Sequence, residues 1–169
     1  QREDWLKDCA PSPLTGEVCM LTIDKYTWSM PSVGEKELLI AYWSIHEKET
    51  AKGNYMVSFG RFDIDYIITR SRILGVQIPC TINPLERYIP MYINLADVLA
   101  NYDHGKKYTS LETYAIAFGH APLKYKKHDG KDVGENFGWF LDNHPDIAIA
   151  HNQEDVEVLN FLISKTLTK

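Results

Sequence analysis

A short apolar segment, residues 55–59 (YMVSF), constrains the fold more than any other part of the sequence. A nearly continuous apolar run of this length is typical of a buried strand. Gly60 ends the run, and a segment with isoleucines at helical spacing then extends from Asp63 to Gly75. Because a strand that leads directly into a helix is the building unit of layered folds, the sequence predicts an α/β fold.

The remaining segments alternate in the same way. Two further strands are predicted from β-forming side chains, over residues 17–28 and 89–94. Four further helices are predicted from apolar spacing and capping signals, over residues 35–49, 110–119, 135–141 and 152–167, and a short helix is predicted to begin at residues 97–99. The last of these has an apolar stripe formed by Val156, Leu159, Ile163 and Leu167. Residues 124–134 predict a polar, basic loop.

Composition limits the classes of protein that this chain can belong to. Its 169 residues suit a single domain, and 44% hydrophobic with 24% charged residues excludes a disordered chain. The net charge of −5 means that any nucleic acid must be bound by a local basic patch. No apolar run is long enough for a membrane span. Three cysteines without close spacing favour a reducing compartment, so a cytoplasmic location is expected.

Two places in the sequence carry the chemical signal. Asp63 follows the predicted strand and its turn, at the start of the next helix, where open α/β sheets place their ligands. His151 and Asp155 are four residues apart, so a helix would project both from one face. Carboxylates bind hard cations such as Mg²⁺ or Mn²⁺, which suit phosphate chemistry.

Structural alternatives remain open for each of these residues. Asp63 is equally a candidate helix cap, and Asp155 a candidate first-turn acid that complements the helix dipole. A single histidine such as His151 is often a hydrogen-bonded structural residue. Asp97 follows a predicted strand and is a reserve metal ligand, although a helix cap is the favoured interpretation.

A lysine-rich segment is the strongest candidate for contact with phosphate. Lys124, Tyr125, Lys126 and Lys127 combine positive charge with an aromatic ring, and residues 105–108 form a weaker basic stretch. A solvated loop is the alternative. Arg61 and Arg70 are further phosphate-binding candidates, with surface ion pairs as the alternative. Three aromatic residues near the second strand are predicted to lie in the core: Phe59, Phe62 and Tyr66.

Taken in order, four segments resemble the DEDD superfamily of 3′–5′ exonucleases. The resemblance is closest to predicted bacterial and phage exonucleases related to the proofreading domain of family B DNA polymerases, and it covers nearly the whole chain. Residues 5–18 (WLKDCAPSPLTGEV) resemble the family's entry into its second strand. Residues 59–66 (FGRFDIDY) resemble its second motif, and residues 151–156 (HNQEDV) its third. Between these motifs lie matching positions at Ser110, Leu111, Phe118, Gly119 and Lys124.

The resemblance implies both a fold and an activity. The fold is an RNase H-like mixed β-sheet flanked by helices, and the activity is hydrolysis of the 3′-terminal phosphodiester of DNA. Asp63 and Asp155 are then two of four acidic ligands for two Mg²⁺ or Mn²⁺ ions, and His151 orients or deprotonates the attacking water. The expected partner is the 3′ end of single-stranded DNA or another nucleic acid, with no membrane.

The sequence also departs from the family pattern. The opening Asp-x-Glu motif is missing, and Asp24 is rejected as a substitute because Tyr26 stands at the partner position. We therefore expect residues 1–169 to be one exonuclease-like domain that is N-terminally incomplete and lacks its first strand. His151 stands where the subgroup with this spacing has Tyr, and the Asn that often precedes the second motif is absent. The alternatives are an inactive nucleic-acid-binding or scaffold domain of the same fold and a metal-independent hydrolase that uses His151 and Asp155.

Overall fold

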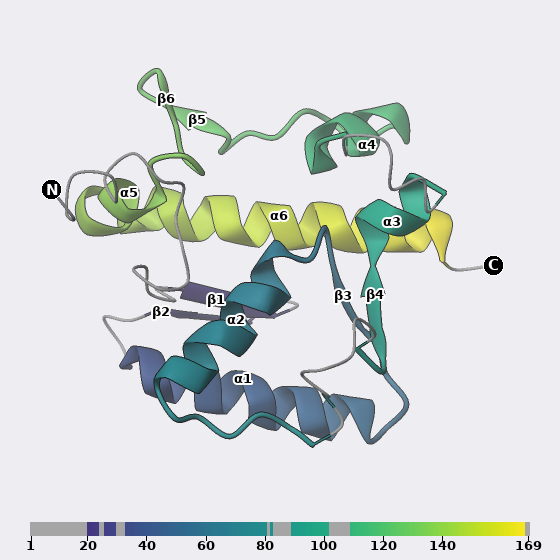
Figure 1. Ribbon diagram of the computed structural model, residues 1–169. Helices are drawn as coiled ribbons and strands as arrows, with labels where there is room; N and C mark the ends of the chain where they lie inside the picture. Colours follow the sequence, from purple (N-terminus) through teal and green to yellow (C-terminus); the bar gives the residue numbers. More distant parts are fainter. Residues whose placement is uncertain are drawn as a thin grey trace, which may run out of the picture. The chain divides into compact units, whose positions relative to one another are not determined.

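The computed structural model describes residues 20–23, 26–29, 33–80, 82, 89–101 and 109–167. These residues form two compact units (Figure 1). Unit one contains the described residues of Ser29–Met56 and Arg61–Tyr92, and unit two those of Met20–Trp28, Val57–Gly60 and Ile93–Lys169. Both helices and strands are present, so the mixed α/β class is confirmed. None of the described helices is long and apolar enough to cross a membrane.

Unit one consists mainly of two helices packed against each other, α1 (Glu35–Thr50) and α2 (Phe62–Ile73). Both agree within one or two residues with the predicted helices. The turn after α2 uses Gly75, whose φ of 64° lies in the left-handed region that favours glycine. The apolar core of this unit, among the described residues, consists of Leu38, Leu39, Tyr42, Trp43, Ile64, Ile67, Ile68, Val76, Ile82 and Ile89.

Polar contacts inside unit one fix α2 against α1. The Trp43 indole Nε1–H donates a 2.8 Å hydrogen bond to Oγ of Ser71, which is fully buried. Two atoms of the Arg70 guanidinium donate to the carboxylate of Glu35 at 2.8 and 2.6 Å, and both residues are less than 10% exposed. This buried ion pair corrects the expectation that Arg70 lies at the surface.

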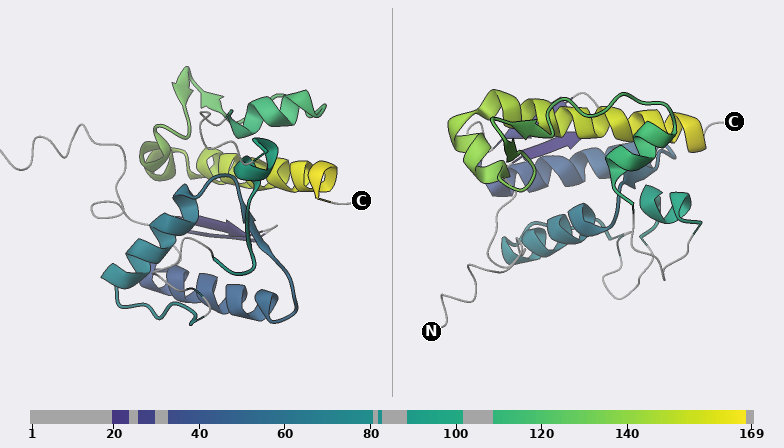
Figure 2. Two further views of the ribbon diagram at one scale, coloured as in Figure 1. Left: turned by 45° about the vertical axis from the view of Figure 1, so that its right-hand side comes forward. Right: turned by 90° about the horizontal axis from the view of Figure 1, so that it is seen from above.

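Unit two is organised around one long helix, α6 (Pro145–Thr166). Helices α4 (Leu111–Ala117) and α5 (Phe137–Asn143) pack along it (Figures 1 and 2). One core cluster joins Leu95 from α3 (Leu95–Leu99) with Ala115 and with Val158 and Leu162 of α6. A second cluster joins Val133, Phe140 and Ala148. The buried positions of α6 therefore differ from the predicted stripe, because several elements cover the helix.

The strands are shorter than predicted and form two-stranded sheets in the described part of the chain. Residues 17–28, expected to form one strand, contain the paired strands β1 (Met20–Ile23) and β2 (Tyr26–Ser29). Strand β3 (Met56–Ser58) pairs with β4 (Tyr92–Asn94) and is half-buried, so the prediction of a fully buried strand is wrong. Strands β5 (Lys127–His128) and β6 (Lys131–Asp132) form an antiparallel hairpin inside the predicted loop.

Candidate functional site

His151 and Asp155 project from the same face of α6. Nε2 of His151 lies 3.7 Å from Oδ2 of Asp155, which suits an ion pair when the imidazole is protonated but is too long for a hydrogen bond. Helix α6 begins at Pro145, so both residues lie well inside it, whereas the prediction placed them at its start. The alternative in which Asp155 is a first-turn acid is therefore wrong.

The surroundings of His151 leave one ring nitrogen available. Nδ1 is buried and has no hydrogen-bond partner among the described residues. Nε2 faces Gly134, where an added Cβ would lie 3.4 Å from this nitrogen and 3.5 Å from Oδ1 of Asp132. The side chain of His151 is 13% exposed. Because Gly134 has no side chain, no side-chain atom of this residue covers Nε2.

Glu154 connects the lysine-rich segment to the same helix. Its two carboxylate oxygens accept hydrogen bonds from the backbone N–H groups of Lys124 at 2.8 Å and Tyr125 at 2.9 Å. Glu154 directly precedes Asp155 in α6. The lysine-rich segment is therefore held on the helix that carries His151 and Asp155, although about thirty residues separate the bonded groups.

Glu112 of α4 holds the same segment from another side. It accepts a hydrogen bond from the backbone N–H of Leu123 and one from Nζ of Lys126. The hydrogen bond between these side chains raises the pKa of Lys126 and lowers that of Glu112. Lys126 is thus partly neutralised, whereas Lys124, Tyr125 and Lys127 remain exposed. The predicted nucleic-acid residues are therefore not equivalent.

Asp63 lies in unit one, as the second residue of α2. The N-cap of this helix is Arg61, and no side chain makes a capping hydrogen bond there, so the interpretation of Asp63 as a cap is wrong. The Asp63 side chain is solvent-exposed, yet nearby protein atoms displace part of the water around its carboxyl, and this desolvation raises its pKa. Burial raises the pKa of the neighbouring Tyr42 phenol, and the charges of Tyr92 and Asp63 raise it further.

The turn after β3 is held by Asn94, a residue that sequence reasoning did not select. Oδ1 of Asn94 accepts hydrogen bonds from the backbone N–H groups of Gly60 at 2.8 Å and Ala96 at 3.1 Å. Its Nδ2 donates to Oδ2 of Asp97 at 2.7 Å. The cap of α3 is therefore Asn94 and not Asp97, which lies in the first turn. Gly60 adopts a φ of 88°, a conformation that L side chains rarely take.

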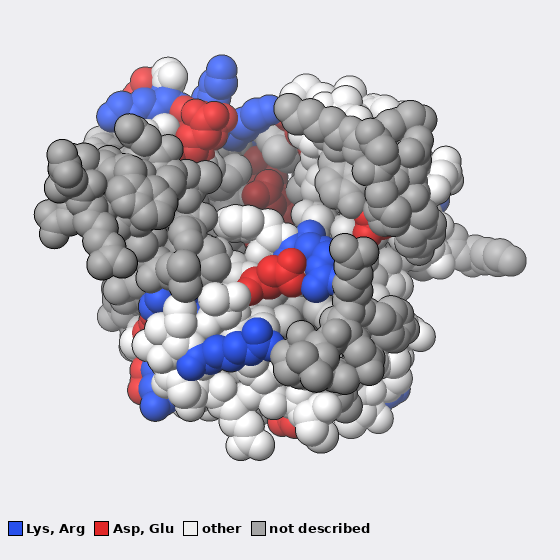
Figure 3. All heavy atoms as spheres, in the orientation of Figure 1, with Lys and Arg blue, Asp and Glu red and all other residues white. Residues whose placement is uncertain are grey.

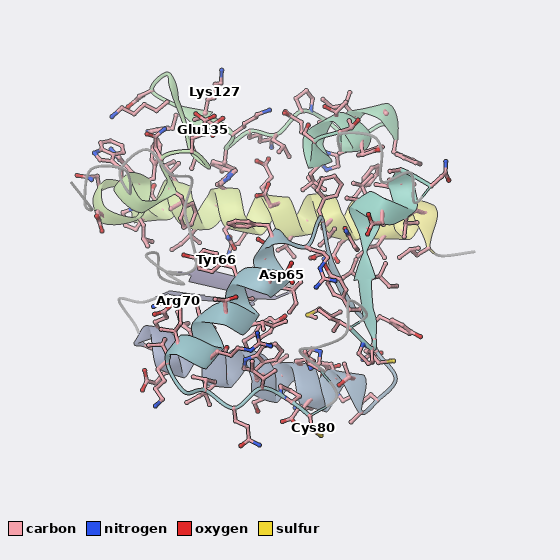
Figure 4. All side chains as sticks on the ribbon, in the orientation of Figure 1. Asp65, Tyr66, Arg70, Cys80, Lys127 and Glu135 are labelled. Carbon is pink, nitrogen blue, oxygen red and sulfur yellow. The ribbon has the colours of Figure 1, made fainter. Side chains whose placement is uncertain are left out.

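The charged and aromatic residues at the start of α2 and within it differ in burial and in their ion-pair partners (Figure 4). Arg61 forms an exposed ion pair with Asp65 at 2.8 Å, as its structural alternative predicted. Arg70 is engaged by Glu35 in the core and is not presented to a phosphate. Phe62 is 62% exposed, so the prediction that it lies in the core is wrong. The buried residues of α2 are Ile64, Ile67, Ile68, Arg70 and Ser71, and Phe62 lies outside that face.

Oxygen ligands suit hard cations, and the carboxylates of Asp63 and Asp155 have this chemistry. Within the described part of the chain, no group of three or more His, Cys, Asp or Glu side chains could hold a metal ion. Asp24, residues 5–18 and residues 105–108, which the sequence analysis considered, lie outside the described residues.

A scan against protein-family models and searches of curated proteins and of solved structures find no match to this chain. We therefore infer its function from the residues of this chain. Three of these were missed by sequence reasoning: Asn94, Glu112 and Glu154. Their partners lie 11 to 34 residues away, and no local pattern reports such contacts.

Proposed function

We propose that this protein is a metal-dependent 3′–5′ exonuclease with an RNase H-like fold, acting on the 3′ end of single-stranded DNA. The observation that carries the proposal is the His151–Asp155 pair on α6, with the lysine-rich segment bonded to the adjacent Glu154. Helix α6 thus carries a candidate general base and a carboxylate, and the lysine-rich segment that attracts phosphate is bonded to the same helix. The order of the motifs in the sequence supports the same activity.

Each residue has a defined role in the proposed reaction. His151 accepts a proton at Nε2 from the water that attacks the terminal phosphodiester. The resemblance to the exonuclease family assigns Asp63 and Asp155 as carboxylates that would bind Mg²⁺ or Mn²⁺. When bound, such cations stabilise the charge that develops on the attacking and leaving oxygens. Exposed Lys124 and Lys127 attract the phosphates of the strand.

Because the pKa of Asp63 is raised, the proposed binding of the cation should depend on pH. A protonated carboxyl binds a cation poorly, so protons and cations compete for this side chain. Acidification should therefore raise the cation concentration needed for half-maximal activity of the parent protein.

The main test measures release of nucleotides from a 5′-labelled oligodeoxynucleotide by the full-length protein with Mg²⁺ or Mn²⁺. His151→Gln should lower the rate roughly 10²- to 10⁴-fold, the usual contribution of a general base. Asp155→Asn and Asp63→Asn should lower it at least as far. Asp146→Asn is the matched control, because it removes an exposed carboxylate from the first turn of α6. Parental rates in both Asp63→Asn and Asp155→Asn would refute the proposal.

The role of Nε2 has its own test, which does not depend on nuclease activity. Diethyl pyrocarbonate acylates a neutral imidazole nitrogen, and only Nε2 of His151 can react because Nδ1 is buried. Gly134→Ala places a methyl group beside Nε2 and should slow the modification of His151, measured by mass spectrometry. Gly138→Ala is the matched control, since its added Cβ meets no atom within 4 Å and neither glycine has a positive φ. Equal rates in the two variants would contradict this geometry.

The second candidate is a nucleic-acid-binding domain of the same fold without catalysis. It is favoured by the missing Asp-x-Glu motif in residues 1–169. It predicts that the protein binds single-stranded DNA and leaves it intact at every Mg²⁺ and Mn²⁺ concentration. A metal-independent hydrolase predicts instead that cleavage continues in a chelator, whereas the proposed exonuclease stops.

A further inference from the structure

A tryptophan on α5 is held in an open position beside the β5–β6 hairpin. Trp139 is 43% exposed, and Nζ of Lys131 lies 3.7 Å from the centroid of its ring. The ring of Phe140 meets it edge-on at 5.0 Å, and the ring of His144 lies 5.3 Å away. Lys131 lies over the indole ring, and because the residue is still 43% exposed, part of the aromatic surface remains open to a ligand.

The hairpin places Lys131 against this ring. His128 and Lys131 are paired across the strands, so both project from the same face of the hairpin. The His128 ring lies 6.0 Å from Phe140 and 5.5 Å from His144, which identifies this face as the one toward α5. Lys127 occupies the neighbouring strand position and therefore projects from the opposite face; it is exposed, and Figure 4 shows it at the outer edge of the hairpin.

The exposed segment that leads into the hairpin has the same character. Lys124 and Tyr125 are both exposed, and Glu154 fixes their backbone. We define the hairpin surface as Lys124, Tyr125, Lys131 and Trp139. In Figure 3 basic side chains gather over this hairpin with acidic ones among them.

We propose that the hairpin surface binds single-stranded DNA, with one base stacked on Trp139 and an adjacent phosphate held by Lys131. Exposed aromatic rings and exposed ammonium groups are the side chains that bind the bases and phosphates of a single strand, and Tyr125, Trp139, Lys124 and Lys131 supply both kinds. A cation over an indole also keeps positive charge at the place where a stacked nucleotide brings its phosphate. The choice of DNA rests on the proposed exonuclease function, but binding at this surface requires no catalysis.

Asp129 is an acidic residue on the same hairpin, and its charge should weaken the binding of DNA. It lies at the tip of the hairpin, is 83% exposed in its side chain, and approaches Nε2 of His128 at 3.6 Å. Its φ of 50° is one that Asn also adopts readily. Asp129→Asn should therefore remove a charge that repels phosphate while it leaves the turn intact.

The experiment measures binding of the full-length protein to oligodeoxythymidylate in EDTA, which prevents metal-dependent cleavage. Binding is followed by fluorescence anisotropy of a labelled oligonucleotide and by quenching of tryptophan emission. Trp139→Ala should weaken binding roughly 5- to 100-fold, as the loss of one stacked base does. Trp139→Phe should retain most of the affinity and lose most of the quenching.

Charge variants test the phosphate contacts. Lys131→Gln should weaken binding and reduce the slope of log affinity against log salt by about 0.7, the value for one phosphate contact on a single strand. Lys165→Gln is the matched control, because Lys165 also lies over an aromatic ring, that of Phe161 at 5.4 Å, near the other end of α6. Asp129→Asn should tighten binding.

Unchanged affinity in Trp139→Ala and Lys131→Gln would overturn the proposal, and so would equal losses in Lys131→Gln and Lys165→Gln. A preference for oligouridylate over oligodeoxythymidylate would overturn the assignment to DNA. Failure of the exonuclease proposal is a separate result, since it would appear as intact DNA in Mg²⁺ or Mn²⁺ while the binding measured in EDTA persists.

Discussion

Helices α2 and α6 both carry proposed catalytic residues, but they use their polar side chains in different ways. On α2, Arg70 and Ser71 turn inward and join the helix to α1. On α6, His151, Glu154 and Asp155 are partly exposed and contact loops or each other. The buried Arg70 of α2 therefore stabilises the fold, whereas His151, Glu154 and Asp155 of α6 arrange groups that a substrate can reach. Residue type alone does not separate the two uses.

The largest expected effect is the loss of stability when the buried ion pair of α2 is removed. Arg70→Met leaves the Glu35 carboxylate buried without its partner and should lower the free energy of unfolding by about 3–5 kcal/mol. Arg61→Met removes an exposed pair from the same helix and should cost at most about 1 kcal/mol. Urea denaturation measures both values. Similar losses in the two variants would show that burial does not distinguish these arginines.

On α6 the corresponding change is Glu154→Gln. The amide side chain replaces a charged acceptor of two backbone N–H groups by a neutral one. Hydrogen exchange at the Lys124 and Tyr125 amides should accelerate about fivefold to tenfold, because a hydrogen bond to a charged group is the stronger kind. Glu157→Gln changes an exposed glutamate on the same helix and should leave both amides as they are. If the two variants exchange alike, the anchoring role of Glu154 is wrong.

Buried His46 on α1 should make the stability of the protein depend on pH. It is 6% exposed, neither ring nitrogen has a partner among the described residues, and burial lowers its pKa. In the unfolded chain it takes up a proton below its ordinary pKa of 6.5, whereas the folded chain does so only at lower pH. Stability should therefore fall as the pH drops below 6.5, by up to about 1.4 kcal/mol per pH unit until the folded pKa is reached.

The variant that checks this prediction is His46→Phe, which keeps a ring beside Trp43 without a titrating group. Chemical denaturation at a series of pH values should show a shallower acid slope than in the parent. Identical profiles would mean that the imidazole titrates normally in the folded chain.

The smallest effect is expected at Asp63, where function and stability should oppose each other. Desolvation raises its folded pKa, so its contribution to stability is largest below its ordinary pKa and is lost as the pH rises through the folded value. At neutral pH, Asp63→Asn should therefore raise the melting temperature slightly while it abolishes nuclease activity. Asp65→Asn, which removes the ion pair with Arg61, should lower the melting temperature slightly. A lower melting temperature in Asp63→Asn would contradict the desolvation argument.

The helices of unit one were predictable because their signals are local. The spacing of isoleucines set the buried face of α2, and Gly75 marked the turn after it. The cap at Ser110 was also readable, since its Oγ accepts a hydrogen bond from the N–H of Thr113 three residues away. Such features depend on neighbours within one helical turn, which the sequence shows directly.

The errors occurred where distant segments decide the outcome. The sequence placed the start of the last helix at residue 152, whereas α6 begins at Pro145, because proline suits the first position of a helix and Ala148 is buried in a cluster with Val133 and Phe140. The hairpin of residues 127–132 lies in a segment too polar to predict strands. The exposure of Phe62 likewise depends on which face of α2 meets α1.

By itself, the sequence determined the α/β class, the helices of unit one and the pairing of His151 with Asp155, because each follows from the repeat of a helix or strand. Tertiary structure alone decided which charges are buried, as for Arg70, and which are anchors, as for Glu154. It also placed Gly134 against Nε2 of His151 and Lys131 over Trp139. The physical reason is that burial and hydrogen bonding depend on groups far apart in the chain, and local periodicity carries no information about them.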